Sequence, residues 1–131
     1  DETCLEEINV AARTTAEAGS GDLSQDHICC GNLGLMLILE ALIRGPWSLD
    51  PSTVAVAQDT AAQIRARVMA RCSGEFIEMK CFSTKESLLV LPGLFTGLSG
   101  MAMALLDDQD SRHTTLNLIT AGLWNSSLSV A

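Results

Sequence analysis

The chain has 131 residues, enough for one compact domain, and 47% of them are hydrophobic, which excludes an intrinsically disordered protein. Tyrosine is absent and aromatic residues make up only 4%, so the core must be aliphatic, a composition that favours helices over sheets. The formal net charge of −8, with no basic cluster, makes nucleic acid and anionic membrane surfaces poor partners.

The cysteines and the apolar runs indicate the cellular environment. The five cysteines are an odd number, which cannot close into a full disulfide set, and the adjacent Cys29 and Cys30 are badly placed for bridging. A reduced, cytoplasmic protein is therefore expected. No signal-peptide pattern occurs, and Glu40 interrupts the longest apolar run well short of the ~20 residues of a spanning helix. We thus expect no membrane span.

Residues 3–18 predict an amphipathic helix. Thr3 and Glu6 have the spacing of a capping box, in which each side chain bonds the backbone N–H of the other residue. The glycines of the stretch 19–21 end the pattern. One face of the helix carries the candidate core residues: Leu5, Ile8, Ala12 and Thr15. This pattern predicts an outer helix, apolar on one side.

The next two predicted helices differ in how much of their surface is apolar. Residues 31–44 are apolar on nearly all sides, which is typical of a helix buried among other helices, and Gly45-Pro46 ends it. The following helix starts near Asp50-Pro51 and runs to about Arg71. Its apolar stripe has five members: Val54, Ala57, Ala61, Ile64 and Val68. Four polar residues are expected to face solvent: Asp59, Gln63, Arg65 and Arg67.

Residues 72–92 are less regular. The stretch "GEFIEMKCF" alternates weakly and predicts a short strand or an extended loop. After Pro92, "GLFTGLSGMAMALL" predicts a fourth helix that is again apolar almost all round. Residues 114–119 are either extended or the start of a final helix. The helices therefore follow the order outer, inner, outer, inner.

The two predicted inner helices begin alike. "CGNLGLM" at 30–36 aligns with "TGLSGMA" at 96–102, and the glycines of both G-x-x-G patterns are offset by the same 66 positions. Such an echo is typical of stacked helical pairs. Glycine at these positions would let the start of a buried helix come close to neighbouring backbone.

Cys29 and Cys30 are the main chemical candidates. Thiolates are the soft ligands that zinc prefers, and the start of a helix would stabilise their charge. A complete zinc site needs at least three protein ligands. The alternative is a pair of buried structural cysteines, since free cysteine is among the most buried residue types. His27 would act as a ligand, a proton shuttle or a local hydrogen-bonding group.

The remaining polar candidates are assigned structural or surface roles. The other cysteines are scattered and fit no zinc module: Cys4, Cys72 and Cys81. His113 lies in a polar segment and is expected at the surface, and the aspartates of 107–110 are expected to end the fourth helix. No Ser-His-Asp constellation is evident, and the glycine patterns do not follow strands, so they are not phosphate loops.

Two blocks, "DHICCGNLG" at 26–34 and "LPGLFTGLSGMAMALL" at 91–106, resemble a known family. Together with the terminal "TLNLITAGL", they look like the C-terminal end of the cyclase domain of type II lanthionine synthetases, in the lanthionine synthetase C-like family. The similarity runs over about residues 3–124, and the context D-H-x-C-C-G-N-x-G is its specific part.

The resemblance implies an all-α fold, a partial α/α toroid of alternating outer and inner helices, with one short extended segment allowed. It implies a zinc ion held by Cys29 and Cys30 of the Cys-Cys-Gly motif. His27, two residues before the motif, is the candidate for its second shell. In that family zinc binds a cysteine thiol of a precursor peptide and lowers its pKa. The thiolate then adds to dehydroalanine or dehydrobutyrine, which closes a lanthionine or methyllanthionine ring.

The sequence departs from the family in what it lacks. The third zinc cysteine, in a Trp-Cys-x-Gly block, and the histidine and aspartate proposed for proton transfer lie upstream in the family and have no counterpart here. Residues 1–131 are therefore expected to form a single partial domain, the C-terminal segment of a cyclase domain with an incomplete active site. Its catalytic residues stay unknown. The implied partners are the precursor peptide and either the remainder of the synthetase or a second copy.

Two other functions stay open. The chain is alternatively a non-catalytic helical module that binds a peptide or partner through an exposed inner face. A third alternative is a redox or metal-sensing protein that uses the adjacent thiols. The sequence leaves open whether the chain by itself is an enzyme.

Overall fold

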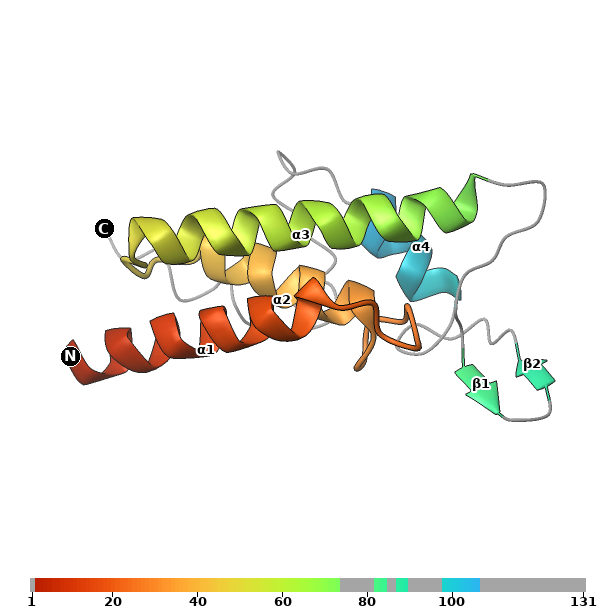
Figure 1. Cartoon of the computed structure of the whole chain (residues 1–131), viewed down its shortest axis with the longest axis horizontal. Helices are drawn as coiled ribbons and strands as arrows, with labels where there is room; N and C mark the ends of the chain where they lie inside the picture. The colour runs from red at the N-terminus through yellow and green to blue at the C-terminus, as the bar shows by residue number, and fades with distance from the viewer. Residues whose placement is uncertain (1, 74–81, 85–86, 90–97, 107–131) are drawn as a thin grey trace.

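The fold belongs to the all-α class, as expected. The computed structural model describes residues 2–73, 82–84, 87–89 and 98–106. In these ranges the helices are α1 (Glu2–Ser20), α2 (Asn32–Arg44), α3 (Pro51–Cys72) and α4 (Leu98–Leu106), as Figure 1 shows. A short antiparallel hairpin of β1 (Phe82–Thr84) and β2 (Ser87–Leu89), in which Phe82 pairs with Leu89, lies within the irregular region 72–92. Of the stretch "GEFIEMKCF", for which a short strand or extended loop was predicted, all but Phe82 lies outside the described residues. The predicted tail lies outside the described residues.

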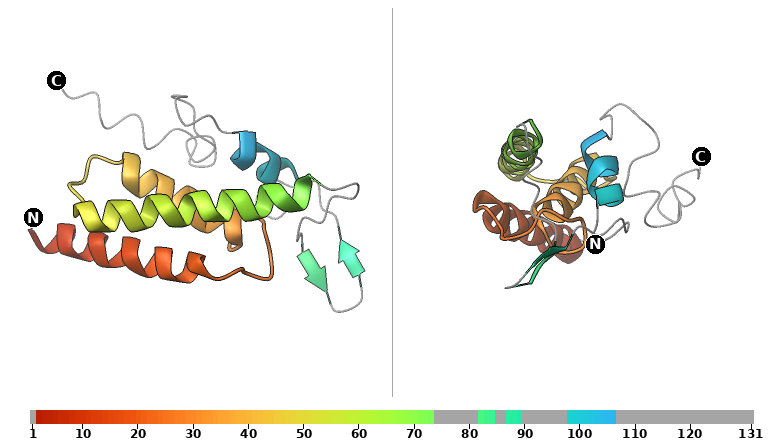
Figure 2. Two further views of the ribbon diagram at one scale, coloured as in Figure 1. Left: turned by 45° about the horizontal axis from the view of Figure 1, so that its top comes forward. Right: turned by 90° about the vertical axis from the view of Figure 1, so that its right-hand side faces the viewer.

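Helix α2 lies at the centre of the helical assembly. It contacts α1, α3 and α4, and the end-on view of Figure 2 shows it between them. Its buried side chains lie on several faces and include Leu33, Met36, Leu37 and Leu39. The burial is not complete, because Ile38 is 46% exposed. The prediction of an inner helix is thus confirmed for most of its surface.

Helices α1 and α3 pack on α2 and on each other through one face each. In α3 four of the five predicted stripe residues are buried, while Val54 is half-buried. In α1 the buried residues are small ones, Ala12, Ala16 and Gly19. A Cβ on Gly19 would lie 2.9 Å from Ile64 Cδ1, so small residues are what let α1 approach α3. Leu5, expected in the core, is 37% exposed.

The prediction that Arg65 and Arg67 face solvent is wrong, because both bond to backbone carbonyls. Arg67 donates to the carbonyl oxygens of the 19–21 turn at 2.6, 3.0 and 2.9 Å, where α1 ends. Arg65 donates to the carbonyl of Leu105 in α4 at 3.0 Å. The last carbonyls of a helix have no partner within the helix, and a guanidinium supplies the missing donors. Asp59 and Gln63 are exposed as expected.

No described helix combines the length and the apolar character that crossing a bilayer requires.

Candidate functional site: the thiol loop at the start of α2

The two adjacent cysteines lie at the end of the loop 21–31, immediately before α2. Both Cys29 and Cys30 are exposed and carry free thiols. The alternative of two buried structural cysteines is therefore wrong. Of the other described cysteines, Cys4 is exposed on α1 and Cys72 is half-buried at the end of α3. The thiols of Cys29 and Cys30 are therefore both accessible to a soft metal ion or an electrophile.

The loop is held on the first turn of α2 by backbone hydrogen bonds. The N–H groups of Gly31, Asn32 and Leu33 donate to the carbonyl oxygens of His27, Gln25 and Asp26 at 3.1, 2.9 and 3.3 Å. These are the amides that a helix start leaves without partners. The loop therefore caps the helix with its own carbonyls, and no side-chain cap is present at Gly31.

The glycines of the first G-x-x-G pattern make this seating possible. A Cβ on Gly31 would lie 2.6 Å from the carbonyl oxygen of His27, and one on Gly34 would lie 2.4 Å from that of Ile28. Both obstacles are backbone atoms that cannot rotate away. The expected close approach at this helix start is confirmed. Gly97 of the second pattern lies outside the described residues.

His27 supports the loop from inside. Its side chain is buried, Nδ1 accepts the N–H of Cys30 at 3.4 Å, and Nε2 pairs with Gln25 Oε1 at 2.5 Å. Since Nδ1 accepts, the ring proton lies on Nε2, which donates to the amide oxygen. Both ring nitrogens are thus engaged within the loop. This geometry suits a supporting role behind the thiols better than direct ligation.

A buried polar network, which the sequence patterns did not predict, ties the loop to the end of α3. Asp26 is completely buried, and Arg71 binds both of its oxygens, Nε to Oδ2 at 3.0 Å and Nη2 to Oδ1. Asn32 donates to Asp26 Oδ1 at 2.8 Å and accepts the N–H of Leu23 at 3.1 Å. Arg71 also lies 3.4 Å from the carboxylate of Asp22.

The charge of Arg71 is strongly favoured in this network. Burial opposes the charge, but the hydrogen bond and charge of Asp26, followed by those of Asp22, raise the pKa of Arg71 above its usual value. The sequence carries only a weak signal for this network, namely that Asp26 and Asn32 flank the Cys-Cys-Gly motif. Their partner lies 45 residues away on another helix, and local patterns carry no information about such a pair.

The electrostatics around the thiols differ from the expectation. Desolvation, and then the charge and hydrogen bonding of the Cys29 thiol, raise the pKa of Cys30. The expected stabilisation of thiolate by the helix start is therefore wrong for Cys30. The backbone N–H groups at the start of α2 already bond to loop carbonyls, and the N–H of Cys30 bonds to His27, so these groups do not offset the desolvation of the thiol. An unliganded Cys30 is thus a protonated thiol at neutral pH.

The donor set fits part of a zinc site. Two exposed soft thiols on adjacent residues match two of the ligand positions that zinc prefers. Within the described ranges, no group of three or more His, Cys, Asp and Glu side chains is arranged to hold a metal ion. A third ligand would have to come from outside these ranges. Cys81 and His113 also lie outside them.

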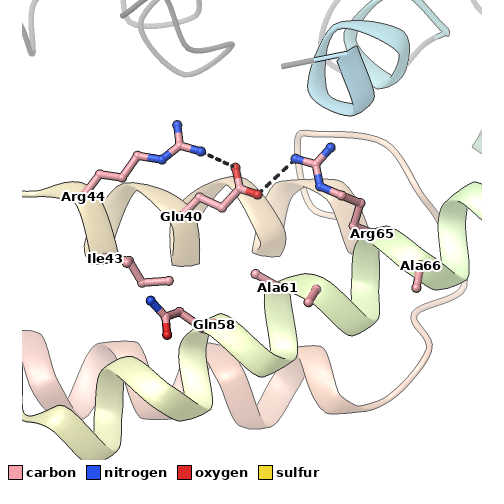
Figure 3. A pocket seen from close by; sticks show the side chains of 8 residues that line it. Glu40, Ile43, Arg44, Gln58, Ala61, Arg65 and Ala66 are labelled. Atoms are coloured by element: carbon pink, nitrogen blue, oxygen red, sulfur yellow. Dashed lines mark hydrogen bonds and ion pairs between the residues drawn. The ribbon is translucent and has the colours of Figure 1, made fainter. Parts of the chain in front are cut away.

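A groove between α2 and α3 is a second candidate site. It has a volume of about 500 Å³ and lies beside the C-terminal half of α2, at the end opposite the thiols. Figure 3 shows Glu40 between two guanidinium groups, with Arg65 Nη2 at 3.0 Å and Arg44 Nη2 at 3.4 Å from its carboxylate oxygens. Alanine side chains of α3, including Ala61 and Ala66, form part of its lining.

No family model, no curated protein and no solved structure matches the chain. The resemblance to lanthionine synthetase cyclases therefore stays a prediction from the quoted residues.

Proposed function

We propose that the chain is the C-terminal part of a zinc-dependent lanthipeptide cyclase, incomplete on its own, with Cys29 and Cys30 as two of the zinc ligands. The observation that carries the proposal is the pair of exposed thiols in the loop immediately before a central helix. In such a cyclase the substrate is a precursor peptide that carries a cysteine and a dehydrated serine or threonine.

The order of the helices supports a partial toroid. The first three helices alternate between an outer position for α1 and α3 and an inner position for α2, and α4 packs on α2. We propose that α2 and α4 belong to an inner ring and that α1 and α3 belong to an outer ring. The thiols would then lie at the end of the inner ring at which α2 begins.

The chemistry divides between the metal and the chain. Bound zinc would act as a Lewis acid that lowers the pKa of a peptide cysteine, so that its sulfur adds to the β-carbon of the dehydrated residue. The residues of this chain hold the site: Cys29 and Cys30 supply thiol ligands, and His27 fixes the backbone of Cys30. The third ligand and the groups that move protons are proposed to lie outside the described residues.

Metal analysis tests the proposal. We expect near-stoichiometric zinc, measured by inductively coupled plasma mass spectrometry, when the chain is joined to the preceding part of a cyclase domain. We expect much less zinc in the chain alone. Cys29→Ala and Cys30→Ala should each abolish most of the binding, whereas Cys4→Ala, an exposed thiol on α1, should leave it unchanged. A joined protein without zinc, or unchanged zinc in Cys29→Ala, would refute the proposal.

The groove between α2 and α3 favours a second candidate, a non-catalytic module that binds a peptide or partner. A recess of about 500 Å³ with alanine side chains and a charged triad is suited to holding a side chain of a bound peptide. In this case binding of a peptide would be weakened by Ala66→Trp, which fills the groove from an exposed position of its lining, and unaffected by loss of both thiols. The cyclase proposal predicts the reverse.

A further inference from the structure

We propose that the Asp26–Arg71 ion pair positions the thiols of Cys29 and Cys30, so that both can bind one soft cation or one dithiol-reactive electrophile. The inference rests on the proposed function in one respect, since it takes the thiol pair as the ligand-binding element. Asp26 and Arg71 touch no ligand themselves, and they act as positioning residues through the loop.

The first step of the argument is the anchor on α3. Arg71 donates hydrogen bonds to both carboxylate oxygens of Asp26, so the plane of the carboxylate is fixed as well as its position. Asp26 is completely buried and Arg71 is largely so, with 15% of its side chain exposed. Salt and water screen such a pair far less than an exposed one. The loop is therefore tied rigidly to the last turn of α3.

The second step runs from the carboxylate to the backbone. The carbonyl of Asp26 accepts the N–H of Leu33, and the carbonyls on either side of it accept the N–H groups of Asn32 and Gly31. The side chain of Asn32 reaches back to Asp26 Oδ1. Fixing Asp26 thus fixes three consecutive carbonyls on the first turn of α2.

The third step concerns the four residues after Asp26. His27 and Ile28 are buried, and the N–H of Cys30 is held by the His27 ring. The thiols of Cys29 and Cys30 are exposed, whereas the backbone before and after these two residues is fixed by hydrogen bonds. Binding one atom with two sulfurs requires both side chains to converge, and a backbone that is already fixed loses less entropy in doing so. Mutation of a residue that orients metal ligands typically lowers the affinity for the metal by about 10- to 100-fold.

Phenylarsonous acid is a suitable probe because it needs two thiols and no third ligand. Its two As–OH bonds break and two As–S bonds form, and each thiol proton leaves with a hydroxide as water. No oxidant or reductant is required. Its affinity reports on the pair itself, independently of whether zinc is ever bound.

The experiment measures arsenical affinity in the full chain by titration. Arg71→Met should weaken it by about 10- to 100-fold, and Asp26→Asn, which has nearly the same size, should do the same. The double variant should lose no more than either single one, because both remove the same link. Arg67→Met is the matched control: Arg67 lies one turn earlier on α3 and bonds to the carbonyls of 19–21, at the end of the loop farthest in sequence from the thiols, so affinity should stay at the wild-type value. Cys29→Ala should abolish tight binding.

A monofunctional alkylating reagent separates positioning from general loosening. It needs only one thiol, so its rates at Cys29 and Cys30 should change little in Arg71→Met. Wild-type arsenical affinity in either variant that folds, judged by helical circular dichroism, overturns the proposal. An equal loss in Arg67→Met also overturns it. If Arg71→Met does not fold, Asp26→Asn decides the question alone. Absence of zinc in the joined protein would refute the proposed function and leave this result standing.

Discussion

Gly34 lies directly against the carbonyl oxygen of Ile28: a Cβ at this position would be 2.4 Å from that oxygen. No real Cβ approaches an oxygen so closely, so the backbone of the thiol loop and that of α2 are in contact. The position of the loop is thus fixed by the absence of a side chain as much as by hydrogen bonds. Substitution of this glycine should displace the loop that carries both thiols.

Gly34→Ala is expected to destabilise the protein by about 1–2 kcal/mol. Overpacking of this kind costs ~1–3 kcal/mol, and the better helix propensity of alanine returns ~1 kcal/mol of it at most. The measurement is urea denaturation followed by circular dichroism. Gly21→Ala is the matched control, since nothing lies within 4 Å of a Cβ at Gly21. If the two variants have the same stability, the close contact at Ile28 does not exist.

Arg67→Met is expected to destabilise the end of α1. The guanidinium supplies donors to the carbonyl oxygens of Gly19, Ser20 and Gly21, and the lost hydrogen bonds should cost about 1–2 kcal/mol. Amide hydrogen exchange should rise in the last turn of α1 more than at its start. Arg13→Met is the comparison, because the Arg13–Asp50 pair is 56% and 57% exposed and should contribute less than about 1 kcal/mol. Uniform exchange along α1 in Arg67→Met would contradict the capping role.

The helices were predictable because their signals are local. The apolar residues of 31–44 and the stripe of α3 repeat at helical spacing, and Pro51 does begin α3. The burial of Leu5 was predicted wrongly, because α1 meets α3 through Ala12, Ala16 and Gly19, and the hydrophobic pattern alone does not show which small residues set the approach.

The site was only half predictable, for a related reason. The Cys-Cys-Gly motif is contiguous, so Cys29, Cys30 and the role of the glycines could be seen in the sequence. Arg71 looks like any arginine on an outer helix until α3 is placed beside the loop. Its bond to Asp26 depends on tertiary packing across 45 positions, which periodicity cannot report.

The charged triad of Glu40, Arg44 and Arg65 should show that a buried charge without its partner costs more stability than removal of the whole ion pair. Arg65→Met leaves the carboxylate of Glu40, which is 7% exposed, with Arg44 at 3.4 Å as its remaining ion-pair partner among the described residues. We expect Arg65→Met to lower the free energy of unfolding, measured by urea denaturation, by about 2–3 kcal/mol. The double variant Glu40→Leu/Arg65→Met should be more stable than Arg65→Met, because an apolar side chain removes the unpaired charge. A double variant that is less stable than the single one would show that Glu40 contributes without Arg65.

The reactivity of Cys72 should respond in opposite directions to the two halves of the ion pair. Burial raises the pKa of the Cys72 thiol, the charge of Asp26 raises it further, and the charge of Arg71 lowers it. Only the thiolate reacts with iodoacetamide. Asp26→Asn removes the negative charge, so the pKa of Cys72 should fall and alkylation at neutral pH should become faster. Arg71→Met removes the positive charge, so the pKa should rise, and the pH at which alkylation becomes fast should move upward.

The rates are measured for each cysteine-containing peptide by mass spectrometry over a range of pH. Cys4, exposed on α1 and far along the chain from the pair, serves as the internal reference and should keep its rate in both variants. Simple loosening of the end of α3 would expose Cys72 and accelerate its alkylation in both variants alike. Opposite shifts therefore demonstrate that the charges of Asp26 and Arg71 act on this thiol, and parallel shifts would show that the pair contributes only packing.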